Sequence, residues 1–94
     1  MLKITEILKF DHYTVICRFN TGEIKALNLH SVLMNHIHIK GVANLLNEEL
    51  LHQARIGDMG ELVWPSVVQP DTRGDAAWDY DISPEYFYHH AFTI

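Results

Sequence analysis

"HYTVICRFNTGEIKALNL", residues 12–29, is the stretch that decides the fold. Its first half places apolar residues at every second position, at Tyr13, Val15, Cys17 and Phe19. A period of two with β-branched and aromatic residues is typical of a half-buried β-strand. "NTGE", residues 20–23, then supplies Asn and Gly, which tolerate positive φ and favour a tight turn. With "LKITEILKF" in front of it, this stretch predicts an antiparallel β-meander over residues 2–29.

The period of the apolar residues changes after residue 29. In "HSVLMNHIHIKGVANLLNEELLHQA" they recur mostly at spacings of three to five, at Leu33, Ile37, Val42, Leu46 and Leu50. Such spacing favours helices. Gly41 interrupts the pattern, so we expect two or three short helices within residues 30–52. Asn47, followed by two Glu, has the character of a helix N-cap.

The chain then returns to a strand pattern. "QARIGDMGELVW", residues 53–64, predicts a hairpin with "GDMG" as its turn. Pro65 lacks a backbone donor and is expected to end this ladder. Residues 66–81 carry Pro, Gly and four Asp, and read as a loop. "SPEYFYHHA" predicts a short C-terminal helix from Pro84, with Ser83 as its N-cap.

The sequence therefore predicts one α+β domain spanning residues 1–94, with a meander, short helices, a hairpin and a short C-terminal helix. The same periodicities predict its core. The expected core residues are Val15, Cys17, Phe19, Leu27, Leu33, Leu46, Leu50, Ile56, Leu62 and Trp64.

Composition and charge exclude several classes of function. The 94 residues include 12 Asp and Glu but only 7 Lys and Arg, which gives a net charge of −5 with neutral His. A nucleic-acid-binding protein normally has a basic face, so nucleic acid is not an expected partner. No apolar run reaches the roughly 18 residues of a membrane span, and charges interrupt the N-terminus. A single Cys fits a reducing compartment, and we expect a cytoplasmic protein.

The sequence gives little indication of a catalytic site or a metal site. The seven His include pairs at i,i+1 and i,i+2, such as His89–His90 and His36–His38, which do not share a helical face. Cys17 alternates in register with core residues, so its thiol is expected to be inert. The sequence holds no phosphate-binding loop and no recognisable catalytic triad. We therefore expect no catalytic residue, metal or cofactor, and a protein that is not an enzyme.

The segment from Asp71 to Tyr88 is the strongest candidate for a binding surface. It is acidic, and it holds about half of the aromatic residues of the chain. Aromatic anchors flanked by charge are typical of protein interfaces. The predicted partner-binding residues are Asp75, Trp78, Asp79, Tyr80 and Tyr86. In the alternative interpretation, these aromatics pack on the meander or form the seam of a homodimer.

Several short motifs along the chain carry a resemblance to a known family. They are the "TGE" turn at residues 21–23, Gly60, Trp64–Pro65, "SPE" at residues 83–85 and Tyr88. In this order they resemble the bacterial family called domain of unknown function 2442, over nearly the whole chain. Asn28 departs from the Asp expected at the end of its strand. The resemblance implies a small α+β domain that acts as the antitoxin half of a toxin–antitoxin pair. Its partner would be a small protein encoded by an adjacent gene.

Two classes of function stay open at this point. The first is a non-enzymatic protein-interaction domain that binds a small partner protein. The second is a small-ligand or metal-binding sensor, or a hydrolase, that uses the histidines and the acidic segment.

Overall fold

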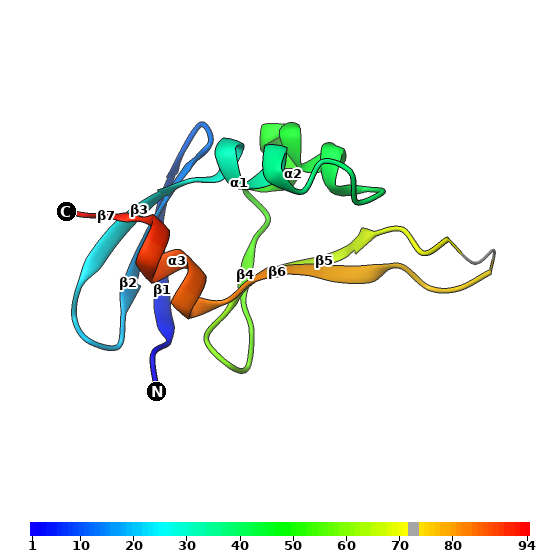
Figure 1. Ribbon diagram of the computed structural model, residues 1–94. Helices are drawn as coiled ribbons and strands as arrows, with labels where there is room; N and C mark the ends of the chain where they lie inside the picture. Colours follow the sequence, from blue (N-terminus) through cyan, green and yellow to red (C-terminus); the bar gives the residue numbers. More distant parts are fainter. Residues whose placement is uncertain (72–73) are drawn as a thin grey trace.

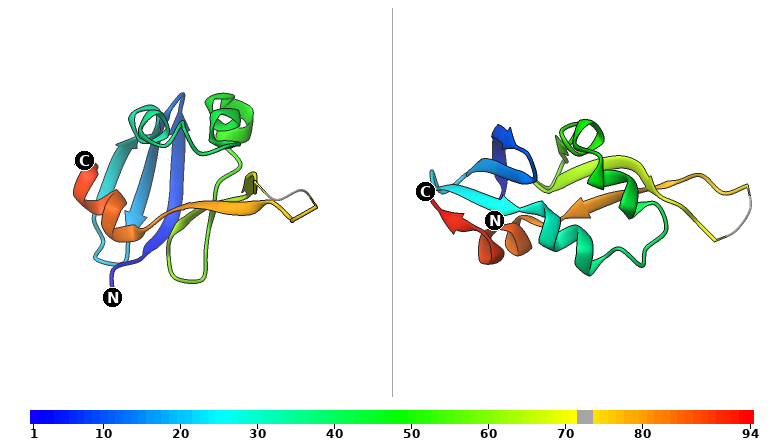
Figure 2. Two further views of the ribbon diagram at one scale, coloured as in Figure 1. Left: turned by 45° about the vertical axis from the view of Figure 1, so that its right-hand side comes forward. Right: turned by 90° about the horizontal axis from the view of Figure 1, so that it is seen from above.

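The computed structural model describes residues 1–71 and 74–94. Within these residues seven strands form two antiparallel sheets, with the strand orders β1-β2-β3-β7 and β4-β5-β6 (Figure 1). Short helices lie between and beside the sheets, as the two further views show (Figure 2). The α+β fold with an N-terminal meander, predicted from the sequence, is confirmed.

The first sheet is the predicted meander with one additional strand. It consists of β1 (Ile4–Asp11), β2 (Thr14–Phe19) and β3 (Ile24–Asn28). β2 and β3 pair in a register that sets Val15 opposite Leu27, so both side chains point into the core. The sequence did not predict β7 (Phe92–Thr93), which pairs with β3. A strand of two residues is too short for a period of two to be recognised.

Four short helical elements follow the pattern expected from the sequence. They are α1 (Leu29–Asn35), the 3-10 helix η1 (Val42–Leu46), α2 (Glu48–Leu51) and α3 (Pro84–His90). The predicted caps are confirmed, because the Asn47 side chain accepts from the Glu49 N–H and the Ser83 hydroxyl accepts from the Tyr86 N–H. Among the described residues, every helix falls short of the length and apolar character that a membrane crossing requires.

The second sheet extends further than the sequence predicted. β4 (Arg55–Ile56) and β5 (Leu62–Val68) form the expected hairpin, but β5 continues past Pro65 to Val68. Its other neighbour is β6 (Trp78–Ile82), so the prediction of a loop over residues 66–81 was wrong at both ends. Pro65 is tolerated because it falls in a register irregularity between Trp64 and Val68, where a missing N–H leaves the ladder on either side intact.

One core cluster receives side chains from both sheets and from the helices. It confirms seven predicted core residues, namely Val15, Cys17, Phe19, Leu27, Leu33, Leu62 and Trp64. The prediction was wrong for Leu50, which is 42% exposed, because α2 has a single turn and directs Leu51 inward instead. Leu46 and Ile56 are half-buried at the margin of the cluster. Tyr80, Ile82 and Phe87 join the core from the segment expected to face a partner.

Candidate protein-interaction site

Strands β5 and β6 form a ribbon that projects from the body of the molecule (Figures 1 and 2). We call this ribbon, together with residues 69–71 and 74–77 that continue from its far end, the arm. Trp64 and Tyr80 pair at its base and are buried, which anchors the ribbon in the core. Beyond them the strands become irregular at Ser66, whose φ is 58°. The Ser66 N–H donates to the Asp79 carboxylate over 3.1 Å, so a cross-strand hydrogen bond holds the irregularity together. The far part of the arm therefore leaves the core while staying paired.

A groove with a volume of about 420 Å³ lies against the far part of the arm, and we call it the arm groove. Its apolar lining comes from Ile39, Val68, Pro70 and Trp78, and its polar lining from His38, Lys40, Gln69, Asp71 and Asp75. One wall belongs to the arm and the other to the segment between α1 and η1. The backbone N–H of Gln69 donates to the carbonyl of Lys40 over 2.8 Å and joins the two walls.

Gly41 allows this close approach of the two walls. Its φ is 101°, and a Cβ built there would lie 2.0 Å from the Val67 carbonyl oxygen. A larger residue at this position would push the η1 segment away from the arm. The backbone of β5 and the segment before η1 can therefore touch only because residue 41 has no side chain.

Two of the predicted partner-binding residues lie in the arm groove. Trp78 is 65% exposed although it belongs to a paired strand, and Asp75 is exposed beside it. Asp79 follows on β6, also exposed, with one carboxylate oxygen on the Ser66 N–H. The structure thus brings Asp75, Trp78 and Asp79 to one arm. Thr72 and Arg73, which belong to the same predicted segment, lie outside the described residues.

Tyr80, which was predicted to bind the partner, is buried and does not belong to this surface. It is only 6% exposed and lies against Trp64, with ring centroids 5.7 Å apart. Its hydroxyl hydrogen-bonds Nδ1 of His36 at 2.7 Å. Burial raises the pKa of Tyr80 to about 12, with smaller contributions from Tyr86 and Asp81. This tyrosine fixes the base of the arm to α1.

Tyr86 lies apart from the arm groove. It sits on α3, half-buried, and its ring stacks on His90 with centroids 3.9 Å apart. It lines a second opening of about 280 Å³, which is formed by Val32 of α1 and the following cap residue His36 together with Asp81, Ile82 and Ser83. Tyr86 therefore shares a surface with the end of β6 rather than with Trp78.

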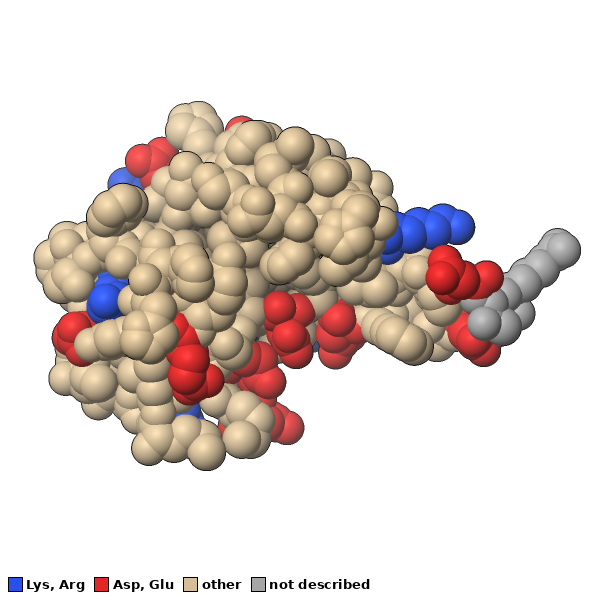
Figure 3. All heavy atoms as spheres, in the orientation of Figure 1, with Lys and Arg blue, Asp and Glu red and all other residues tan. Residues whose placement is uncertain are grey.

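Carboxylates gather below the base of the arm. Figure 3 shows red side chains in the hollow under β6 and again near the far end of the arm. A third opening of about 260 Å³ in this region is lined by Glu61, Asp81 and Glu85, with Met1, Leu2, Met59, Ser83 and Pro84. No Lys or Arg belongs to its described lining. The underside of the second sheet is therefore an acidic surface.

The opposite wall of the arm groove was missed by the sequence reasoning. Its residues were assigned to helices, because Ile37 and Val42 fit a helical spacing. In the structure residues 36–41 form consecutive turns, in which the Ile39 N–H donates to the His36 carbonyl and the Val42 N–H to the Ile39 carbonyl. The local signal for this break in the helices is Gly41.

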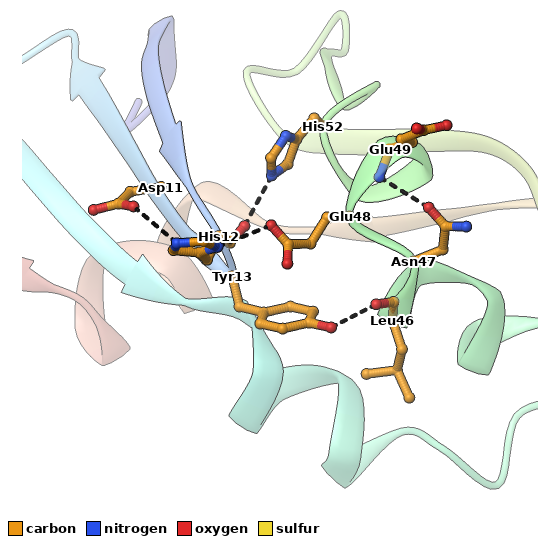
Figure 4. A network of polar contacts seen from close by, with 8 residues as sticks. All are labelled: Asp11, His12, Tyr13, Leu46, Asn47, Glu48, Glu49 and His52. Carbon is orange, nitrogen blue, oxygen red and sulfur yellow. Dashed lines mark hydrogen bonds and ion pairs between the residues drawn. The ribbon is translucent and has the colours of Figure 1, made fainter.

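The histidines make scattered structural contacts. His12, at the β1–β2 turn, places Nδ1 3.2 Å from Glu48 Oε1, and its carbonyl oxygen is 2.8 Å from Nε2 of His52 (Figure 4). Beside them the Tyr13 hydroxyl donates to the carbonyl of Leu46 over 2.6 Å. This network fastens the meander to α2. In residues 1–71 and 74–94, no three His, Cys, Asp or Glu side chains lie together as a metal site would require.

Cys17 is not placed for nucleophilic chemistry. Its side chain is fully buried on the core face of β2. Burial raises the pKa of its thiol from 9.0 to about 12, so the thiolate is absent at neutral pH.

A further opening, of about 250 Å³, lies between η1, α2 and β5 and contains none of the predicted site residues. Its apolar walls come from Leu45, Leu50, Trp64, Pro65 and Val67, and its polar groups from Asn44, Gln53, Arg55 and Ser66. Apolar walls with a few convergent polar groups are typical of small-ligand sites. Arg55 supplies a single positive charge.

Comparison with protein-family models, with curated proteins and with solved structures finds no match for this chain. Membership of the family called domain of unknown function 2442 stays a prediction.

Proposed function

We propose that this chain is a non-enzymatic protein-interaction domain, and that the arm groove binds a small partner protein. The observation that carries the proposal is the exposure of Trp78. A tryptophan that is 65% exposed on a paired strand has its backbone held in place but its ring uncovered. Burying such a ring against a partner removes a large apolar area from water at little cost in conformational entropy.

The lining of the arm groove has the composition of an interface. Apolar surface from Ile39, Val68 and Pro70 lies beside Trp78, and charged groups of Lys40, Asp71 and Asp75 lie around it. Protein interfaces combine an apolar centre that contains aromatic anchors with a polar rim. The arm groove is therefore suited to receive one or two apolar side chains of a partner.

The charge of the molecule favours a basic partner. The chain has a net charge of −5, and Asp71, Asp75 and Asp79 lie on the arm. Complementary charge at an interface raises the association rate and makes it dependent on salt. The resemblance to the family called domain of unknown function 2442 suggests that this partner is a toxin encoded by an adjacent gene. Only that resemblance supports a toxin as the partner.

The experiment is co-purification with the product of the adjacent gene, followed by titration of variants. Trp78→Ala is expected to weaken binding by about 30-fold, the loss typical of an interface hot spot. Phe92→Ala is the matched control, because Phe92 is 76% exposed on the short β7 strand of the other sheet. Equal losses in both variants, or no loss in Trp78→Ala, would contradict the proposal.

A small-ligand sensor is the second candidate function. It is favoured by the 250 Å³ opening beside Trp64 and Arg55 rather than by the histidines, which the structure disperses. The positive charge of Arg55 and the apolar walls fit a small organic acid. Titration with a panel of such acids, observed at the indole N–H resonance of Trp64, tests this candidate. If no acid of the panel shifts this resonance, the small-ligand sensor is contradicted and protein binding remains as the proposed function.

A further inference from the structure

Strand β6 is the outer strand of the second sheet. In the part of the chain that the structure describes, the strand order is β4-β5-β6, and β6 pairs with β5 alone. An outer strand has backbone N–H and C=O groups on its free side that can pair with another chain. Five residues of such an edge, Trp78–Ile82, extend over about 17 Å.

An opening lies near each end of β6. The arm groove lies at its beginning, beside Trp78, and the opening of about 280 Å³ lies at its end, beside Asp81–Ser83. The opposite wall of both openings comes from one continuous stretch of chain. Val32 and His36 line the second opening, and residues 38–40 line the arm groove.

A contact between the two walls lies midway along the edge. The His36 ring and the Tyr80 hydroxyl meet there in a partly buried hydrogen bond of 2.7 Å. Because Tyr80 is buried, this contact belongs to the core side of β6 and leaves the outward side of the strand exposed. We call the outward edge of β6, together with the two openings near its ends, the edge channel.

The side chains of β6 give the edge channel a charge pattern. Tyr80 and Ile82 are buried, whereas Asp79 and Asp81 are exposed. Residues two apart in a strand share a face, so both carboxylates lie on the same outward face. A strand laid beside β6 would meet a negative charge at every second position.

The same pattern disfavours a second copy of this chain as the occupant. Antiparallel pairing of two β6 strands centred on Tyr80 would set Asp79 of each copy directly opposite Asp81 of the other. Like charges directly opposite one another in a sheet are destabilising. The edge therefore favours a strand of opposite charge over its own copy.

We propose that β6 accepts an extended segment of the partner protein as an added strand, and that this segment carries Lys or Arg at alternate positions facing Asp79 and Asp81. Backbone hydrogen bonds to β6 would supply affinity, and the two carboxylates would select the sequence. This inference rests on the proposed function and specifies the chemistry of the partner.

The test uses synthetic peptides and the full chain labelled with ¹⁵N. The first peptide, of about nine residues, carries Lys at alternate positions with Val and Thr between them. The second has the same side chains but N-methyl groups on alternate backbone nitrogens, which removes the donors that strand pairing needs. The first peptide is expected to shift the amide resonances of Trp78–Ile82 and to slow their hydrogen exchange, and the second to do neither.

Charge variants distinguish recognition of the peptide by Asp79 and Asp81 from general attraction between the acidic protein and a basic peptide. In the double variant Asp79→Asn/Asp81→Asn, the side-chain amide oxygen at position 79 can still accept from the Ser66 N–H, so the arm keeps its internal hydrogen bond. Binding of the first peptide is expected to weaken about tenfold. Asp11→Asn/Glu49→Gln removes the same net charge from exposed sites on β1 and α2, and is expected to change binding less than about twofold.

The inference would be overturned by resonance shifts confined to residues outside β6, by equal binding of the N-methylated peptide, or by equal weakening of binding in both double variants. A first peptide that leaves β6 unchanged would also overturn it, and Asp79 and Asp81 would then serve only to prevent edge-to-edge aggregation. If Trp78→Ala weakens binding of the natural partner but the double variant at residues 79 and 81 does not, the proposed function stands. Only the added strand is then contradicted.

Discussion

The side-chain ammonium of Lys25 lies 3.8 Å from the centre of the Tyr88 ring and donates to the backbone carbonyl of Tyr88 over 3.0 Å. Lys25 is 7% exposed and is the one charged residue in the described core. The Tyr88 hydroxyl in turn donates to Glu23 over 2.8 Å. These three residues hold α3 against the first sheet, and α3 directly follows β6. The geometry of the end of β6 thus depends on a contact made on the other sheet.

Replacement of Lys25 by Met is expected to destabilise the protein by about 1–3 kcal/mol. The change keeps the apolar stem but removes the cation from the ring and leaves the Tyr88 carbonyl without its donor. Urea denaturation measures the loss. Lys9→Met on the exposed part of β1 is the control and is expected to change stability by less than about 0.5 kcal/mol. Equal stability of the two variants would show that the Lys25 contact contributes nothing.

Replacement of Tyr88 by Phe is expected to cause a loss of stability that depends on pH. The Tyr88 hydroxyl, followed by Thr21, lowers the pKa of Glu23 below its ordinary value of 4.5. A carboxyl whose pKa is lowered on folding contributes stability above its unfolded pKa and loses it as the pH falls through its folded pKa. The difference between wild type and Tyr88→Phe should therefore be present at neutral pH and shrink below about pH 4.5. Urea titrations at a series of acidic pH values test it, and a constant difference would contradict the assignment to Glu23.

Trp64 lies in the core cluster and makes a buried hydrogen bond from Nε1 to the carbonyl of Leu51 over 2.8 Å. Trp64→Ala is expected to destabilise by about 3–5 kcal/mol, because a cavity replaces the ring. Trp64→Phe keeps most of the ring volume but leaves the Leu51 carbonyl unpaired, and is expected to lose about 1–3 kcal/mol. Urea denaturation of both variants gives the comparison. A loss below about 1 kcal/mol for Trp64→Ala would mean that the ring is not part of the core.

Gly41→Ala should open the arm groove. The added Cβ meets the Val67 carbonyl oxygen, whereas at Gly22, with a similar φ of 91°, a Cβ meets nothing within 4 Å. Gly41→Ala and the control Gly22→Ala each lose about 1 kcal/mol of stability because of the positive φ. Only Gly41→Ala adds the clash with the Val67 carbonyl. We expect Gly41→Ala to be the less stable variant in urea and to shift the amide resonances of Val67 and Gln69. Matching stabilities and unchanged resonances would show that the two walls are not in close contact.

The sequence was sufficient for the elements whose signals are local. The period of two in β2 and the caps at Asn47 and Ser83 each lie within a few residues, and each was confirmed. β6 was missed because its alternating Trp78, Tyr80 and Ile82 are separated by Asp, which gives the segment the composition of a loop. Strand formation there depends on pairing with β5, which lies at a distance in the sequence.

The candidate site was predicted in part for the same reason. An acidic, aromatic segment indicates an interface, and Trp78 is indeed exposed. Which aromatic residues of the segment stay exposed is decided by tertiary contacts. Tyr80 is buried because Trp64 and His36 lie against it, and neither contact can be recognised from local sequence. The arm groove also needs residues 38–40, whose approach to β5 depends on the absence of a side chain at Gly41.

Hydrogen exchange of the protein, alone and bound to the product of the adjacent gene, tests the central claim most directly. Binding at the arm groove and edge channel is expected to slow amide exchange in residues 38–41, 66–71 and 78–82, while the β1–β2 hairpin exchanges as in the free protein. Protection confined to the meander or to α2, with residues 78–82 unchanged, would contradict the assignment of the arm as the interaction surface.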